Sequence, residues 1–202
     1  SKRKQTLAAA DFPAHFGTEL IPTAPYLLIP KVSSERRNFI PIGFEQPDTF
    51  CSDLVFMLPN ASLYHFAILT SAMHMAWVRS VCGRLKSDYR YSAGIVYNNF
   101  PWPDAPDDKT RQTIETAAQT VLDARAAFPG ATLADLYDPL TMPPALLKAH
   151  QKLDAAVDKA YGKSSFKSDA ERVAFLFERY QALTSLLPVA ATKRSRKKPA
   201  VT

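Results

Sequence analysis

The stretch RLKSDYRYSAGIVYNNFPWP, from Arg84 to Pro103, decides how the chain is divided. Charged and aromatic residues alternate through its first half, and residues two apart in a strand share a face. We therefore expect two strands, over about 86–92 and 94–99. The first would carry Lys86, Asp88 and Arg90 on one side. Its other side would carry Leu85, Ser87, Tyr89 and Tyr91.

The stretch closes with NNFPWP, which partly matches the Asn-Pro-Pro-aromatic loop of amino-methyltransferases. Here Asn99 is followed by Phe100, so the amide and the adjacent carbonyl would not converge on one amine. Pro101, Trp102 and Pro103 instead indicate a stiff apolar plug between two structural units.

Short apolar runs with turn residues between them precede this stretch and predict three strands, at 26–29, 38–44 and about 50–58. Apolar residues then recur with helical spacing from Ser62 to Val81, and Gly83 follows, which predicts one long helix. His74 lies near the apolar stripe of this helix, so we expect a packed histidine there rather than a ligand.

Helical periodicity dominates after Pro106. Asp107 or Asp108 would cap a first helix, Pro143-Pro144 would open a second, and Ser168 with Glu171 has the spacing of a capping box at the start of a third. We expect an α+β protein: a small mixed or antiparallel sheet with a long packed helix, followed by an all-α helical bundle. The expected regions are an N-terminal remnant of a preceding region (1–23), a β-rich unit (24–103), a helical domain (104–187) and a disordered basic tail (188–202).

The net charge of +6 belongs to the ends of the chain. Eight of the 25 basic residues lie before residue 5 or after residue 192, and the remaining 17 are outnumbered by 19 acidic residues. The charge alone therefore says little about partners. No run is long and apolar enough for a membrane span, and no signal peptide is expected. With only Cys51 and Cys82, both predicted to be buried reduced thiols, a cytoplasmic location is expected.

The sequence lacks the common catalytic motifs. Only six glycines occur and none forms a phosphate-binding loop after a strand, which argues against a nucleotide-type cofactor site. The four histidines lie far apart, and no His/Cys cluster has metal-ligand spacing. We therefore expect no catalytic residue, cofactor or metal in this chain.

Two elements could contact a nucleic acid. Lysine can donate to the acceptors of guanine and aspartate can accept from the amine of cytosine, so Lys86 and Asp88 could together recognise one G·C pair. Ser33, Ser34, Arg36 and Arg37, in the predicted loop PKVSSERR, offer hydroxyl and guanidinium donors of the kind that contact phosphates. For the strand, the pattern alone favours a solvated face over base contacts; for the loop, an ordinary polar turn explains the residues equally well.

The phrases VSSERRNFIPIGF (32–44) and GRLKSDYRYSAGIVYNNFPWP (83–103) resemble the target recognition domain of MmeI-like DNA methyltransferases, which are single-chain type IIG/IIL restriction–modification enzymes and their YeeA-like relatives. LYDPLTMPPALLKAHQKLDAAVDKAYG (136–162) and SDAERVAFLFERYQAL (168–183) are similar to that family's C-terminal helical domain.

The resemblance implies a parent enzyme that methylates the exocyclic amine of adenine with S-adenosylmethionine. It implies double-stranded DNA and an N-terminal methyltransferase domain of the same polypeptide as partners. Carried over by position, Lys86 and Asp88 would recognise one base pair and Arg90 a neighbouring one. A rival hypothesis is a non-catalytic scaffold that binds a protein partner through Tyr89, Tyr91 and Tyr97.

Overall fold

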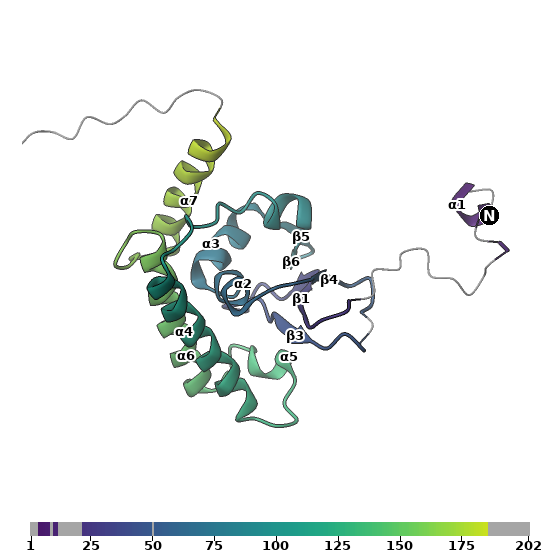
Figure 1. The fold of residues 1–202 in the computed structure, drawn as a ribbon, viewed down its shortest axis with the longest axis horizontal. Coiled ribbons are helices and arrows are strands. Elements are labelled where there is room, and N and C mark those ends of the chain that lie inside the picture. The colour runs from purple at the N-terminus through teal and green to yellow at the C-terminus, as the bar shows by residue number, and fades with distance from the viewer. Residues whose placement is uncertain (1–3, 9, 12–21, 50, 186–202) are drawn as a thin grey trace, which may run out of the picture.

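The computed structural model describes residues 4–8, 10–11, 22–49 and 51–185 (Figure 1). The predicted disordered tail at 188–202 lies outside these residues, as does most of the predicted N-terminal remnant at 1–23. A short helix, α1 (Lys4–Ala8), is described within that remnant. No helix in the described part of the chain has the length and apolar character needed to cross a membrane.

A first antiparallel sheet has the strand order β3-β1-β4. Its strands are β1 (Tyr26–Pro30), β3 (Gly43–Glu45) and β4 (Val55–Leu58). The predicted strand over 38–44 is wrong except at its end. Pro41 interrupts that segment and has no amide hydrogen to give to a strand ladder. Phe39, Ile40 and Ile42 are still buried, so the apolar pattern located the core but not the strand.

A second antiparallel sheet has the order β2-β6-β5. It consists of β2 (Val32–Ser33), β5 (Gly83–Leu85) and β6 (Asp88–Arg90). The predicted strand over 94–99 is wrong, because residues Ala93–Tyr97 form a single π-helical turn, η1. The Ser92 hydroxyl caps this turn by accepting a hydrogen bond from the Ile95 amide at 3.1 Å, and serine at such a cap favours coiling over extension.

The predicted helix over 62–81 is present but broken into α2 (Leu63–Leu69) and α3 (Ala72–Val81). The Ser71 hydroxyl accepts from the His74 amide and donates to the Ile68 carbonyl, so it closes one helix while it opens the next. The Asp154 carboxylate also accepts from the Ala72 amide at 2.7 Å.

Four helices complete the fold: α4 (Asp108–Ala126), α5 (Leu133–Leu136), α6 (Pro144–Ala160) and α7 (Asp169–Thr184). The predicted caps at Asp107 and Ser168 are confirmed. The α+β class is also confirmed, but the helices do not form a self-contained three-helix bundle. Helix α4 packs against α6 and α2, whereas α7 packs against α3 (Figure 1). One hydrophobic core, from Leu27 to Leu176, therefore serves both halves of the chain.

The segment NNFPWP joins the two halves as the predicted apolar plug. Phe100 is buried, and Trp102 packs at the edge of the core. The Tyr161 hydroxyl donates to the Pro101 carbonyl at 3.2 Å, and Arg179 Nε donates to the Trp102 carbonyl at 2.8 Å. The backbone of the plug is thus held by α7 and by the residue that ends α6.

Arg125 of α4 makes a second connection between the halves, from a buried position. Its guanidinium donates to the Ile42 carbonyl at 2.8 Å and to the Tyr137 hydroxyl at 2.8 Å. That hydroxyl also lies 2.6 Å from Nε2 of His150 on α6. A buried cation needs such partners, because an unpaired charge in the core is strongly destabilising.

Asp154 of α6 gives the fold a testable dependence on pH. Burial raises the pKa of Asp154 to about 7, against the opposing effects of the Ala72 amide and Arg172. The folded protein therefore binds more protons than the unfolded chain between about pH 4 and pH 7, and its stability falls as the pH rises through that range.

We expect Asp154→Asn to stabilise the fold above pH 7, because asparagine keeps an acceptor for the Ala72 amide without a buried charge. The gain should be on the order of a few kcal/mol, from about 1.4 kcal/mol for each unit of pKa shift. Urea unfolding at several pH values between 4 and 8 measures it. Asp123→Asn, at an exposed carboxylate of α4, is the control. A difference between wild type and Asp154→Asn that stays constant with pH contradicts the prediction.

Candidate nucleic-acid interface

The β5–β6 hairpin is oriented by two tyrosines that lie beneath it. Tyr89 and Tyr91 are 4% and 2% exposed. The Tyr91 hydroxyl lies 3.0 Å from Nε2 of His74, which is fully buried in α3, and the Tyr91 amide donates to the Lys31 carbonyl at 2.8 Å. Burial lowers the pKa of His74 to about 3, so the ring is neutral. The prediction of a packed histidine is confirmed.

Strand alternation then determines which side chains lie on the opposite side of the sheet. Because Tyr89 points inward, Asp88 and Arg90 point outward. Residues directly opposite each other on antiparallel strands share a face, and the register pairs Asp88 with Leu85 and Arg90 with both Gly83 and Val32. We call Val32, Leu85, Asp88 and Arg90 the outer face. The sequence pattern predicted Leu85 on the side opposite Asp88. Leu85 and Asp88 lie on different strands and pair across the turn, so they share a face.

Lys86 does not lie in a strand, contrary to the prediction. It occupies the turn between β5 and β6, is exposed, and has a left-handed backbone conformation with φ of 56°. The predicted row of three charged side chains on one strand is therefore wrong. Asp88 and Arg90 form a pair on the outer face, and Lys86 stands at the tip of the hairpin two residues from Asp88.

The segment Ser33–Arg37 lies directly beside this hairpin. Ser33 is the register partner of Tyr89, and the Glu35 amide donates to Oδ1 of Asp88 at 3.3 Å. Arg36 is exposed, while Ser34 and Arg37 are half-buried. Ser33 is only 2% exposed, and its hydroxyl has no hydrogen-bond partner among the described residues. Ser33 is too buried to make the predicted contact with a DNA backbone, because its side chain shares the inward face with Tyr89.

Two further cations, Arg84 and Lys31, lie near the hairpin and were not among the predicted site residues. The guanidinium of Arg84 lies 4.2 Å from the ring centroid of Tyr89 and donates to the Ser87 carbonyl at 2.9 Å. The ammonium of Lys31 lies 4.8 Å from the centroid of Phe56 and donates to the Asp53 carbonyl. Arg84 could have been found from its place in the quoted stretch, but Lys31 joins the surface only through tertiary pairing. Together the cations of this hairpin surface are Lys31, Arg36, Arg37, Arg84, Lys86 and Arg90.

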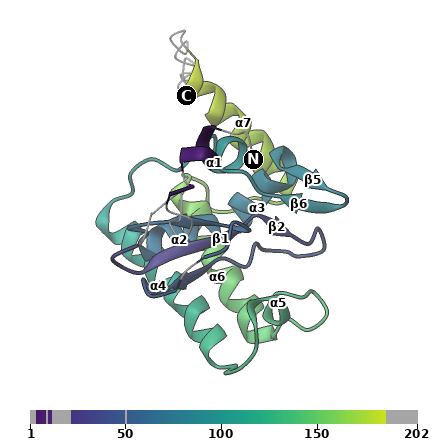
Figure 2. The same ribbon diagram turned by 90° about the vertical axis from the view of Figure 1, so that its right-hand side faces the viewer.

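Figure 2 shows the β5–β6 hairpin projecting from one edge of the fold, away from the end that carries α5. Two-stranded ribbons of this kind fit the major groove of B-form DNA, which is about 12 Å wide. The surface mixes donors with two carboxylates: Asp88 is half-buried, and the exposed Glu35 lies 3.9 Å from the guanidinium of Arg84. That mixture is suited to contacts with base edges rather than with phosphates alone.

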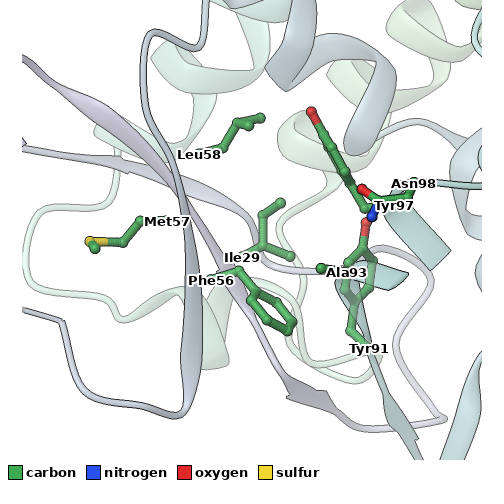
Figure 3. Close-up of a pocket in the computed structure, with 8 residues that line it drawn as sticks. All are labelled: Ile29, Phe56, Met57, Leu58, Tyr91, Ala93, Tyr97 and Asn98. Carbon is green, nitrogen blue, oxygen red and sulfur yellow. The ribbon is translucent and has the colours of Figure 1, made fainter. Parts of the chain in front are cut away.

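A cavity of about 210 Å³ lies between the first sheet and the segment around η1 (Figure 3). Its polar groups include the hydroxyl of Tyr97 and the side-chain amide of Asn98, and the rest of its lining is mainly apolar. Burial raises the pKa of Tyr97, so its hydroxyl remains protonated at neutral pH. The lining residues are Ile29, Phe56, Met57, Leu58, Tyr91, Ala93, Tyr97 and Asn98.

Several side chains that were considered as functional groups are wholly or partly buried. Tyr89 and Tyr91, which the scaffold hypothesis needed at the surface, are buried, and Tyr97 is half-buried. Cys51 and Cys82 are free thiols, as predicted, but half-buried rather than buried. Within the described ranges, no group of three or more His, Cys, Asp or Glu side chains is arranged to hold a metal ion.

Two protein-family models match this chain. Residues 1–104 match the model of the MmeI target recognition domain, and residues 106–188 match that of the MmeI C-terminal domain. DNA methyltransferase A of Bacillus subtilis (strain 168) is 47% identical over 158 residues, which are 78% of this chain and 18% of that protein.

A solved structure of the type IIL restriction–modification enzyme MmeI in complex with DNA is similar over 92% of this chain. Its TM-score is 0.87 and its sequence identity 49%, and the match covers 25% of that chain. The present chain therefore spans a quarter or less of the length of either relative. From the two domain models and the shared fold, the chain belongs to the MmeI family, of which it carries the target recognition domain and the C-terminal domain.

Proposed function

We propose that this chain is the sequence-specific DNA-recognition part of an adenine-specific DNA methyltransferase. The observation that carries the proposal is the outer face: Asp88 and Arg90 project from one hairpin whose inner side is fixed by buried tyrosines, and Lys86 stands at its tip. Side chains held on a rigid ribbon can enter a groove in one orientation. The bound DNA of the MmeI structure supports the same partner.

Catalysis would belong to a methyltransferase domain that precedes this chain in one polypeptide. That domain would use S-adenosylmethionine to methylate the exocyclic amine of adenine, in a cytoplasmic enzyme. The residues described here do not fit the cofactor. The 210 Å³ cavity is below the roughly 300–1,000 Å³ usual for small-molecule sites. The larger groove between α4 and α6 is lined by lysine, threonine, glutamine and alanine, with no carboxylate to bind ribose hydroxyls.

The chemistry of Asp88 and Lys86 favours a G·C pair. Oδ1 of Asp88 accepts from the Glu35 amide, which orients the carboxylate and leaves its second oxygen for the exocyclic amine of cytosine. The ammonium of Lys86 can donate to O6 and N7 of the paired guanine. We assign Arg90 to a neighbouring base pair because its guanidinium extends from the same face one strand repeat away.

Arg36, Arg37 and Ser34 are proposed to contact the DNA backbone next to that pair. Arg36 is exposed, and the segment that carries it is joined to the base-contacting strand through Glu35 and Asp88. Phosphate contacts made from this segment would fix the register of the hairpin along the duplex without adding sequence information. Ser33 is removed from this set because it is buried.

The scaffold hypothesis is weakened by the burial of its aromatic residues. A protein-binding surface is usually centred on accessible aromatic or arginine side chains in an apolar setting. Here Tyr89 and Tyr91 lie in the core, and the accessible groups around the hairpin are mostly cations. Duplex binding that does not weaken as the salt concentration rises would favour the scaffold.

The unusual backbone conformation of Lys86 supports a functional role for its side chain. A left-handed conformation costs an L-residue about 1–2 kcal/mol, and glycine or asparagine is usual at such positions. In the proposed role, a contact between the Lys86 ammonium and DNA would offset that conformational cost.

We expect Lys86→Gly to leave the free energy of unfolding unchanged or to raise it by up to about 1 kcal/mol. Lys148→Gly, at an exposed position inside α6, should lower it by about 1 kcal/mol. Chemical denaturation of both variants makes the comparison. Equal losses of stability in the two variants would count against strain at Lys86.

Exchanging the base-contacting pair should change the site that the enzyme methylates. In the full-length enzyme, Lys86→Glu combined with Asp88→Arg reverses the donor and acceptor pattern and should convert G·C to C·G at one position. Each good contact discriminates by about 1–3 kcal/mol, so the old site should be lost as the new one appears. Genome-wide mapping of methylated adenines provides the measurement, and an unchanged site in an active variant refutes the assignment.

Replacing Arg36 should have a different effect. Arg36→Ala should weaken binding to all duplexes alike and reduce the slope of log K against log salt by about 1, because one phosphate contact is lost. Arg111→Ala, at an exposed residue of α4, is the control and should leave the slope unchanged. Duplex titrations at several salt concentrations measure both. A changed sequence preference in Arg36→Ala would show that Arg36 contacts a base.

A further inference from the structure

The outer face carries two exposed apolar side chains that the proposed base contacts do not use. Leu85 is 49% exposed and Val32 is 39% exposed. The register places Leu85 opposite Asp88, and Val32 opposite Arg90, with the bare Gly83 on the other flank of Arg90. Each charged residue of this face thus has an apolar neighbour directly across the sheet.

Their position separates these residues from ordinary exposed apolar side chains, which are common on protein surfaces. Leu85 immediately precedes the turn at Lys86, at the most projecting part of the hairpin, where polar residues are usual. Cations also surround it, since Arg84 and Lys86 are its chain neighbours. An apolar group in the middle of a basic, groove-sized ribbon would be dehydrated only when the ribbon meets its partner.

The major groove of DNA presents one apolar group on its base edges, the C5-methyl group of thymine. We propose that Leu85 contacts the C5-methyl group of the base pair next to the one contacted by Lys86 and Asp88, and so selects a thymine there. The inference rests on the proposed function, since it requires the outer face to enter the major groove. Val32 is placed to make the equivalent contact beside Arg90.

The spacing agrees with this assignment. Side chains directly opposite each other on antiparallel strands have Cβ atoms about 4.5–5.5 Å apart, and base pairs stack every 3.4 Å. Leu85 is therefore offset from Asp88 by between one and two base-pair steps. The amine of cytosine or adenine at that position would lose water against Leu85 without gaining a hydrogen bond, which adds selectivity against those bases.

The test removes or adds single methyl groups without altering base pairing. The site is first identified from methylated adenines of the full-length enzyme. Duplexes carrying that site and its flanks are then prepared with each thymine replaced in turn by uracil, and each cytosine by 5-methylcytosine. For the wild-type enzyme, we expect about a fourfold loss of affinity at one thymine, the value of one buried methyl group.

In Leu85→Ala, the thymine and uracil duplexes should bind equally at that position, and both should bind more weakly than wild type binds thymine. Leu140→Ala is the matched control, since Leu140 is 81% exposed and lies in the segment between α5 and α6. It should keep the full difference between thymine and uracil.

Two results overturn the inference in distinguishable ways. In the first, the Lys86/Asp88 exchange changes the methylated site, but Leu85→Ala still distinguishes thymine from uracil at every position where wild type does. The Leu85 contact is then wrong and the proposed function stands. If the wild-type enzyme shows no sequence-specific binding to any duplex, both are wrong.

Discussion

The hydrogen bond between Tyr91 and the buried His74 is the constraint on which the candidate interface depends. It fixes the end of β6 against α3, and the neighbouring Tyr89 is buried on the same side. Because side chains alternate along a strand, the two inward tyrosines leave only one outward orientation for Asp88 and Arg90. The uncharged state of His74, kept by burial, lets the imidazole serve as a packed hydrogen-bonding group.

The helices of the second half stabilise the hairpin from behind. Arg125 joins α4 to the irregular segment at Ile42, Asp154 caps α3, and Arg179 binds the backbone of the plug at Trp102. These contacts cross between the regions matched by the two family models, which share one core. The C-terminal domain therefore supports the hairpin surface structurally, and changes far from the hairpin can shift its position. Rigidity matters here, since a base contact is lost when a side chain moves by about 1 Å.

In the proposed role in DNA recognition, the composition of the hairpin surface would favour discrimination between sequences over strength of binding. A purely basic surface would attract any duplex, because phosphate contacts carry no sequence information. Asp88 opposes that attraction and is repelled by phosphates unless a suitable amine faces it. Leu85 and Val32 act in the same direction, because apolar side chains gain little from a polar base edge. The strained Lys86 adds a cation at the tip, where it reaches furthest from the sheet.

The sequence by itself determined the fold class, the buried role of His74, the caps at Asp107 and Ser168, the plug at Pro101–Pro103 and the outward pair Asp88 and Arg90. These follow from local periodicity and capping chemistry, which depend on residues close together in the chain. The turn at Lys86 and the coil over 93–97 are local features, which the alternating pattern of the sequence concealed. Only the tertiary structure decided that Ser33 is buried and that α7 packs on α3. Those two outcomes depend on contacts between distant segments: Ser33 faces inward because β2 pairs with β6, and a short alternating stretch cannot encode where its partner strand lies.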